Sequence, residues 1–230
     1  ERYPAGGGNA DEDTALVGLL RSALLKRFES SAEAFRRTVG RMIREHEVFL
    51  EALSKGRIVR KEFFQELSAA EDEGDIEEIF DTSEHAEDAS AYDSARLGAD
   101  VRSDLTLLRE MAAEATKVQP EGDPKLAALV EALAAVVKQA ASEAADEEDA
   151  RQKRKVLVFS HYEDTIDWIE EHLLAVIGRD LRLVPYRGRV ASVSGADARR
   201  GIARQGALYG FAPVSTGALP PDTEDRFDLL

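Results

Sequence analysis

The chain has 230 residues, a formal net charge of −15 and no cysteine. This length allows one large or two small domains with a hydrophobic core. Without cysteine, disulfide bonds, thiolate catalysis and thiolate metal ligands are excluded. The absence of cysteine fits a reducing compartment, and we expect a cytoplasmic protein. No run of 18 apolar residues is present, so the sequence predicts no membrane span.

The charges are segregated along the chain. Residues 71–100 contain twelve acidic residues and one arginine, whereas residues 21–61 contain eleven basic and five acidic residues. Residues 151–210 contain eleven basic and seven acidic residues. Such basic segments are commonly solvated surface, and a phosphate-binding face is the alternative. The chain starts without methionine or a basic-then-apolar leader, which indicates a piece of a longer protein.

Two helices are predicted near the start of the chain. Apolar residues recur at steps of three and four over residues 14–28. Ser30 and Glu33 have the spacing of a capping box, so a second helix is expected to start at Ser30 and to end near Lys55, with Gly56 as its left-handed cap. This second helix carries a heptad-like seam that is expected to pack against another helix: Phe35, Val39, Met42, His46, Phe49 and Leu53.

The middle of the chain combines weak helical signals with an acidic segment. Residues 58–80 predict one or two helical turns, and residues 81–99 predict an exposed acidic loop. A helix capped by Asp100 or Ser103 is expected to run to about Val118.

A further helix is predicted from Asp123-Pro124, with aspartate as N-cap and proline at the first helical position. It is expected to fade into residues 142–149. Residues 1–150 therefore predict an all-helical domain with an acidic insert at about residues 71–100.

From residue 151 the pattern predicts an α/β unit. Its first strand, residues 155–160, is an apolar run of the type found in parallel sheets that are buried on both faces. Strands and helices then alternate with short connections, which favours a parallel βαβ sheet. The expected elements are a helix at 163–177, a weak strand at 181–185, a strand at 189–194, a helix at 196–209 and a strand from 225.

Motifs for independent catalysis are missing. The sequence contains no phosphate loop, acidic Mg²⁺-binding box, HExxH or GxSxG pattern. The four histidines do not combine into a triad or a metal site: His46 is expected as a hydrogen-bonded core residue, His85 lies in the acidic loop, and His172 falls on an exposed helix face. We therefore assign no catalytic residue and no metal ligand.

Several segments resemble superfamily 2 helicases, in particular prokaryotic Swi/Snf-like ATPases. These segments are KVLVFSHYEDTIDWIEEHL from Lys155, then RVASVSG, then FAP and DRFDLL, together with LRSALLKRFESSAEAF from Leu20. They are similar to the start of the second RecA-like lobe and to the helical region between the lobes. The resemblance covers residues 16–56 and 153–230 and is silent on residues 57–152.

This resemblance implies contacts with the backbone of DNA, expected to be double-stranded, and with the rest of a longer chain. The residues that it assigns to nucleic-acid binding are Ser160, His161, Tyr162, Ser194, Gly195, Arg199, Arg200 and Arg204. Arg37, Arg41 and Arg44 would either steer the duplex or form a solvated face. ATP and Mg²⁺ are expected only for the longer parent, since the phosphate loop and the arginine-finger motif are absent from this chain. We therefore expect no ATP hydrolysis by the chain alone.

Two other classes of function remain open. The chain can be a non-catalytic helical protein–protein interaction domain that uses its seam or its acidic insert. A stand-alone α/β protein that binds a small molecule is the third possibility.

Overall fold

The computed structural model describes residues 10–59, 86–193, 202–218 and 224–230. The chain divides into two compact units, Glu1–Lys117 and Val118–Leu230. The predicted change of character at residue 151 falls within the second unit. The turns expected from residue 60 to residue 80 lie outside the described residues, as does the first part of the acidic loop, up to residue 85.

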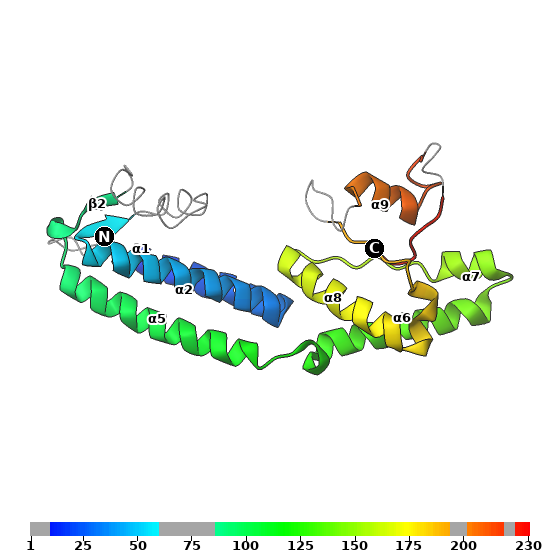
Figure 1. Ribbon diagram of the computed structural model, residues 1–230, viewed down its shortest axis with the longest axis horizontal. Helices are drawn as coiled ribbons and strands as arrows, with labels where there is room; N and C mark the ends of the chain where they lie inside the picture. Colours follow the sequence, from blue (N-terminus) through cyan, green and yellow to red (C-terminus); the bar gives the residue numbers. More distant parts are fainter. Residues whose placement is uncertain (1–9, 60–85, 194–201, 219–223) are drawn as a thin grey trace. The chain divides into compact units, whose positions relative to one another are not determined.

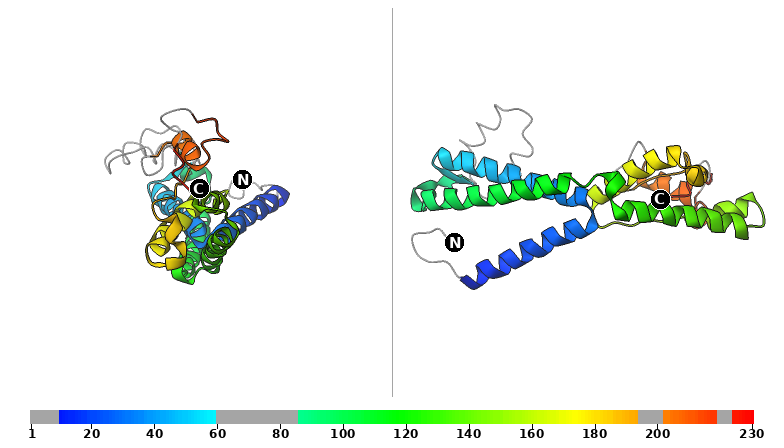
Figure 2. Two further views of the ribbon diagram at one scale, coloured as in Figure 1. Left: turned by 90° about the vertical axis from the view of Figure 1, so that its right-hand side faces the viewer. Right: turned by 90° about the horizontal axis from the view of Figure 1, so that it is seen from below.

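The first unit is built on three long helices, α1 (Ala10–Ser30), α2 (Ala32–Ser54) and α5 (Ser94–Thr116) (Figure 1). Helix α2 packs against both α1 and α5. In Figure 2, α1 and α2 diverge from the point where they join, while α5 runs alongside α2. Strands β1 (Arg57–Val59) and β2 (Ala86–Asp88) pair antiparallel, with Ile58 opposite Glu87.

The core of the first unit lies between α2 and α5. Helix α2 contributes the fully buried Ala34, Val39 and Ala52. Of these, Val39 belongs to the predicted seam, and α2 packs against α1 and α5 as predicted. The other seam residues are half-buried, and His46 is hydrogen-bonded through Nδ1 to the carbonyl oxygen of Met42 at 2.7 Å. Helix α5 contributes four buried residues at helical spacing: Leu97, Leu105, Leu108 and Ala115.

The start of α2 differs from the predicted capping box by one residue. Ser31, not Ser30, is the N-cap, and its Oγ accepts the amide of Ala34 at 3.0 Å. The carboxylate of Glu33 pairs with Arg36 and Arg37. Because Ser30 is still the last residue of α1, only one residue separates the two helices. The predicted C-terminal cap is confirmed, since Gly56 has φ = 76°.

Helix α5 begins within the segment predicted as a loop. Asp93 is its N-cap and accepts the amide of Arg96 at 3.1 Å, so the proposed caps Asp100 and Ser103 are wrong. The loop prediction is also wrong for Ala86–Asp88, which form β2. The small residues of this segment suggested a loop, but Asp93 caps a helix there and Leu97 in its first turn is buried.

The second unit is also mainly helical. It contains α6 (Pro124–Glu143), α7 (Glu147–Lys153), α8 (Glu163–Arg179) and α9 (Arg204–Phe211), with 3₁₀ helices η2 (Pro120–Gly122) and η3 (Leu181–Tyr186). The predicted start of α6 is confirmed: Asp123 is the N-cap and Pro124 the first helical residue. The main core joins α6, α8 and η3: Val130, Leu133, Ala134, Leu173, Val176, Ile177, Leu183, Tyr186 and Leu229.

The predicted RecA-like parallel sheet is wrong. Among the described residues, the only sheet is the antiparallel pair β1–β2 of the first unit. The segments expected as strands in the second unit make only two isolated parallel bridges, Val156–Leu229 and Val190–Leu229. Among the described residues this pairing stays at the two bridges, so no strand forms. The backbone bonds of the pairing run to residues 228–230.

Three other predictions for the second unit are corrected. Residues 181–186 form a 3₁₀ helix with Pro185 inside it rather than a strand. His172 is buried, with 8% of its surface exposed, and not on an exposed helix face. Helix α9 starts at Arg204; the earlier part of the predicted helix, residues 196–201, lies outside the described residues.

Candidate nucleic-acid interface

The carboxyl ends of two extended segments lie at the same edge of the second unit. Val156 and Val190 both bridge Leu229 in parallel, so the two segments are in register with each other. Phe159 is three residues beyond Val156, and Val193 is three residues beyond Val190. Ser160 and the residues that follow it therefore start at the edge where the described part of the second segment, up to Val193, also ends.

Ser160, His161 and Tyr162 form the turn between the first extended segment and α8. The Ser160 hydroxyl accepts the Tyr162 amide at 3.2 Å and lies 3.2 Å from the Tyr162 carbonyl oxygen. Such a turn holds the serine side chain against its own backbone. The exposed His161 ring packs edge-on against Tyr162, with ring centroids 4.8 Å apart. The turn therefore presents His161 and Tyr162 rather than a free serine hydroxyl.

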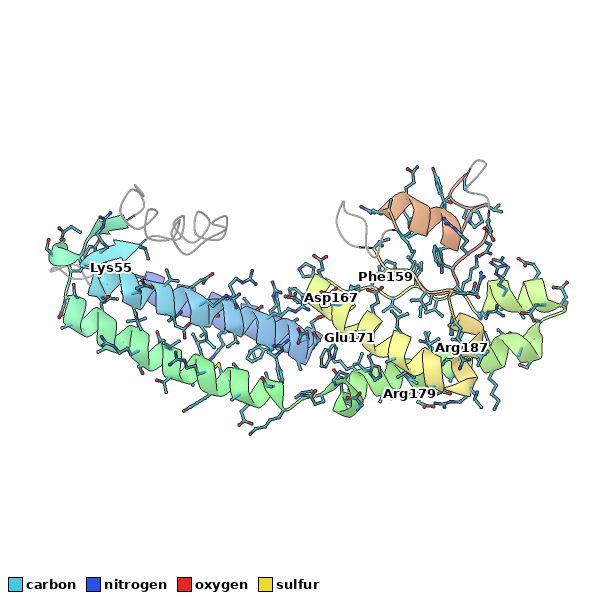
Figure 3. All side chains as sticks on the ribbon, in the orientation of Figure 1. Lys55, Phe159, Asp167, Glu171, Arg179 and Arg187 are labelled. Carbon is cyan, nitrogen blue, oxygen red and sulfur yellow. The ribbon has the colours of Figure 1, made fainter. Side chains whose placement is uncertain are left out.

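The first turn of α8 is acidic. Glu163 and Asp164 are its first two residues, and Asp167 and Glu171 follow on the same helix (Figure 3). Carboxylates in a first turn compensate the positive end of the helix dipole. The N-terminus of α8 is thus already provided with negative charge, so its helix dipole does not offer a free anion site.

The C-terminal end of α8 carries positive charge. Arg179 lies in its last turn, and Arg187 donates from Nε to the carbonyl oxygen of Ile177 and from Nη2 to that of Gly178, both at 3.0 Å. Cations at this end stabilise the helix and satisfy carbonyl groups that have no partner within the helix. Figure 3 labels both arginines.

The remaining predicted contacts are only partly described. Arg204 is the first residue of α9 and is exposed. Helix α9 packs through Ala207 against Ala191 and Phe227. Ser194, Gly195, Arg199 and Arg200 lie outside the described residues.

A network of ion pairs occupies the opposite, amino-terminal end of the extended segments. Asp228 is fully buried, and its carboxylate contacts Arg154 at 2.9 Å, Arg189 at 2.8 Å and Arg151 at 3.5 Å. Asp225 contacts Lys155 at 2.6 Å and Arg151 at 3.1 Å. These side chains are paired with one another, which makes the network a structural element rather than a free anion site.

The charge state of this network follows from its contacts. Burial by itself raises the pKa of Asp228, but the hydrogen bonds from Arg189 and Arg154 outweigh burial and hold that pKa below its usual value. Tyr186 donates its hydroxyl to the Arg154 carbonyl oxygen at 2.8 Å, and burial raises the pKa of Tyr186 to about 12. Sequence reasoning missed the network, although the D-R-F-D spacing brings two carboxylates into one short segment.

The predicted basic residues of α2 differ in the ion pairs that they form. Arg37 lies 2.6 Å from Glu33. Arg41 and Arg44 are exposed, and within the described part of the chain neither forms an ion pair. They lie three residues apart and therefore share one face of the helix.

No other described feature has the composition of an active site. The residues described contain no group of three or more histidine, aspartate or glutamate side chains placed to hold a metal ion. None of the described helices is long and apolar enough to cross a membrane. Neither a protein-family model nor a curated protein nor a solved structure matches the chain.

Proposed function

We propose that the chain is part of a cytoplasmic, ATP-dependent DNA translocase or helicase of superfamily 2, and that it contacts the backbone of duplex DNA. In this proposal, the rest of the longer protein supplies the sites for ATP and Mg²⁺, and the present chain hydrolyses no ATP by itself. His161, Tyr162 and Arg204 are the described residues proposed to contact phosphate or sugar. Such contacts position a protein on DNA without reading bases.

One observation carries the proposal. The register of Val156, Leu229 and Val190 aligns the carboxyl ends of the two segments that hold the helicase-like sequences. The exposed His161 follows the first of these ends. The ion-pair network at the other end keeps its basic side chains paired, so it does not compete for phosphate. In the first unit, Arg41 and Arg44 offer a second cationic surface.

Duplex binding provides the test. Fluorescence anisotropy with a labelled duplex of random sequence should show binding at low salt that weakens as salt increases, because each neutralised phosphate adds about −0.9 to the slope of log K against log salt. Substituting His161→Ala with Arg204→Ala should weaken binding and flatten that slope. Lys138→Ala removes one exposed charge from α6 and serves as the control. Failure to bind at low salt would contradict the proposal, as would ATP hydrolysis by the chain alone.

A non-catalytic interaction domain remains the second candidate because of α1. Its apolar residues Leu20, Leu25 and Phe28 are each about half exposed. Exposed apolar residues on one helix can mark a surface for another protein. Absence of DNA binding at low salt would favour this interaction domain. DNA binding that is insensitive to His161→Ala and Arg204→Ala, but lost with Arg41→Ala and Arg44→Ala, would instead move the proposed DNA contact to the first unit.

A further inference from the structure

Gly40 lies in the middle of α2, where a glycine lowers stability because it loses more backbone freedom on folding than other residues. Close packing explains Gly98 of α5, since a Cβ atom there would lie 3.2 Å from the Leu53 side chain. A Cβ atom at Gly40 would meet only one described atom within 4 Å, Nη1 of Arg44 at 3.9 Å. Among the described residues, no neighbouring helix therefore requires a glycine at this position.

Arginine side chains surround Gly40 on the surface of α2. The surface neighbours of a helical residue are those three and four positions away. For Gly40 these neighbours are Arg36, Arg37, Ile43 and Arg44. Side chains on a helix lean toward its N-terminus, which brings the Arg44 guanidinium back over Gly40 and agrees with the distance of 3.9 Å. Gly40 is thus an uncovered position on a basic helix face.

The buried carboxylate of Glu33 orders the first two of these arginines. It lies 2.7 Å from Nη2 of Arg36 and 2.6 Å from Nε of Arg37. Burial by itself raises the pKa of Glu33, but the hydrogen bonds from Arg36 and Arg37 outweigh burial and hold that pKa below its usual value. Glu33 therefore stays ionised at neutral pH and is engaged by these two side chains.

The acidic residues that follow on α2 do not neutralise Arg41 and Arg44. Glu47 is three residues after Arg44, but it pairs with Arg109 of α5 at 2.6 Å. Glu45 is four residues after Arg41, and within the described part of the chain it forms no ion pair. The two arginines next to Gly40 are therefore exposed cations whose acidic neighbours do not bind them.

We propose that Arg41 and Arg44 hold one phosphate group over Gly40, either from the backbone of duplex DNA or from a small phosphate compound. The planar guanidinium group donates several N–H groups in a geometry that suits phosphate oxygens. Without a side chain at Gly40, a phosphate can approach the helix surface beside both guanidinium groups. The assignment to DNA rests on the proposed function and adds a defined contact in the first unit, whereas the phosphate site itself can be tested without DNA.

Inorganic pyrophosphate tests the site alone. In an amide nitrogen–proton correlation spectrum, the Gly40 signal is identified by its absence in Gly40→Leu. We expect this signal to shift saturably over roughly 0.1–10 mM pyrophosphate, the range of weak dissociation constants, and the shift to be lost in a chain with Arg41→Ala and Arg44→Ala. The signal of Gly178, which also has open space around it, should stay in place. A Gly40 signal that does not shift would overturn the inference, while the proposed function would keep its own test.

Duplex binding by Gly40→Leu identifies the source of the phosphate. The variant changes no charge and favours the helix, so its urea midpoint should rise, yet it covers the position over which the phosphate lies. Duplex affinity should fall about tenfold, the effect of losing one charge-assisted hydrogen bond. Gly178→Leu is the matched control and should leave duplex affinity unchanged.

The other outcomes are distinct. A saturable Gly40 shift together with duplex binding that Gly40→Leu does not weaken would assign the site to a small phosphate compound and leave the proposed function intact. The same shift in a chain that binds no duplex would contradict the proposed function and retain the phosphate site. Duplex binding that only the arginine substitutions weaken, without a pyrophosphate shift, would show diffuse attraction to a basic face and overturn the inference.

Discussion

The indole Nε1 of Trp168 donates a hydrogen bond to Oδ2 of Asp123 at 3.0 Å. The other carboxylate oxygen of Asp123 accepts the amides of Lys125 and Leu126, at 2.8 and 3.4 Å, so that one buried side chain both caps α6 and holds α8. This bond joins residues 45 positions apart in the chain. The start of α6 and the middle of α8 are therefore fixed by a single carboxylate.

Replacing Asp123 by alanine should destabilise the second unit. The change removes the cap of α6 and leaves the Trp168 donor unpaired, a combined loss of about 2–4 kcal/mol. Urea unfolding followed by tryptophan fluorescence measures it, because Trp168 is the only tryptophan. Asp146→Ala removes the exposed N-cap of α7 and is the matched control, with a smaller expected loss. Equal losses would show that the bond to Trp168 contributes nothing.

Replacing Asp228 by asparagine should be more damaging. It leaves the guanidinium groups of Arg154 and Arg189 without their buried counter-charge, at a cost of about 3–5 kcal/mol. Because the pKa of Asp228 is lowered in the folded state, its stabilisation is complete above the unfolded-state pKa, near 4, and is lost as pH falls through the folded-state pKa. Thermal unfolding between pH 3 and pH 7 should thus show a smaller loss of stability in acid for Asp228→Asn than for the native chain.

Glu131→Gln is the control for this experiment. It breaks the exposed pair with Arg182, and exposed pairs contribute little to stability. A pH profile of Asp228→Asn that is parallel to the native profile would exclude Asp228 as the source of acid sensitivity.

Tyr186 should make the second unit sensitive to alkali. Its folded-state pKa is raised to about 12, from about 10 in the unfolded chain, so the neutral phenol is favoured on folding. The resulting stability is complete below pH 10 and is lost as pH rises toward 12, by up to about 3 kcal/mol. Tyr186→Phe should be less stable at pH 7, by about 1 kcal/mol for the lost bond to Arg154, but should lose less stability between pH 9 and pH 11. Chemical denaturation at these three pH values measures both effects.

Gly210 should tolerate no side chain. A Cβ atom there would lie 2.7 Å from the Phe227 ring, and the Gly210 carbonyl accepts the amides of Arg226 and Phe227 at 2.7 and 2.8 Å. Gly210→Ala should therefore destabilise the chain by about 1–3 kcal/mol through overpacking. Gly178→Ala, in the last turns of α8 with open space around it, should instead stabilise by about 0.5–1 kcal/mol. Denaturant midpoints that shift in the same direction for both would contradict this contrast.

The sequence predicted long helices better than it predicted strands. Gly56 and Asp123-Pro124 mark helix ends through local chemistry, so these ends could be recognised without a structure. The run Val156–Phe159 is apolar at every position. Its pattern does not reveal how many extended segments pair with it, or over how many residues. In the described part of the chain, the backbone of this run pairs with residues 228–230.

The sequence predicted candidate residues for the interface, but not how these residues are arranged in space. Ser160, His161 and Tyr162 are adjacent in sequence, and a turn therefore brings them together in any fold. The start of α8 at Glu163 was predicted from the sequence and is confirmed, so its acidic first turn could be read from Glu163 and Asp164 without a structure. The pairing of Arg154 with Asp228 spans 74 positions, a distance that no local pattern predicts.

The 74 positions between Arg154 and Asp228 have a consequence for biosynthesis. Residues 225–230 supply both the carboxylates of the ion-pair network and the backbone partners of Val156 and Ala191. On a ribosome they emerge after every other described part of the second unit. Until then, Arg151, Arg154 and Arg189 lack their main counter-charges, and the main core lacks Leu229. Helices α6 and α8 can form early, but the second unit can reach its final packing only after translation has passed these residues, so its consolidation is a late event.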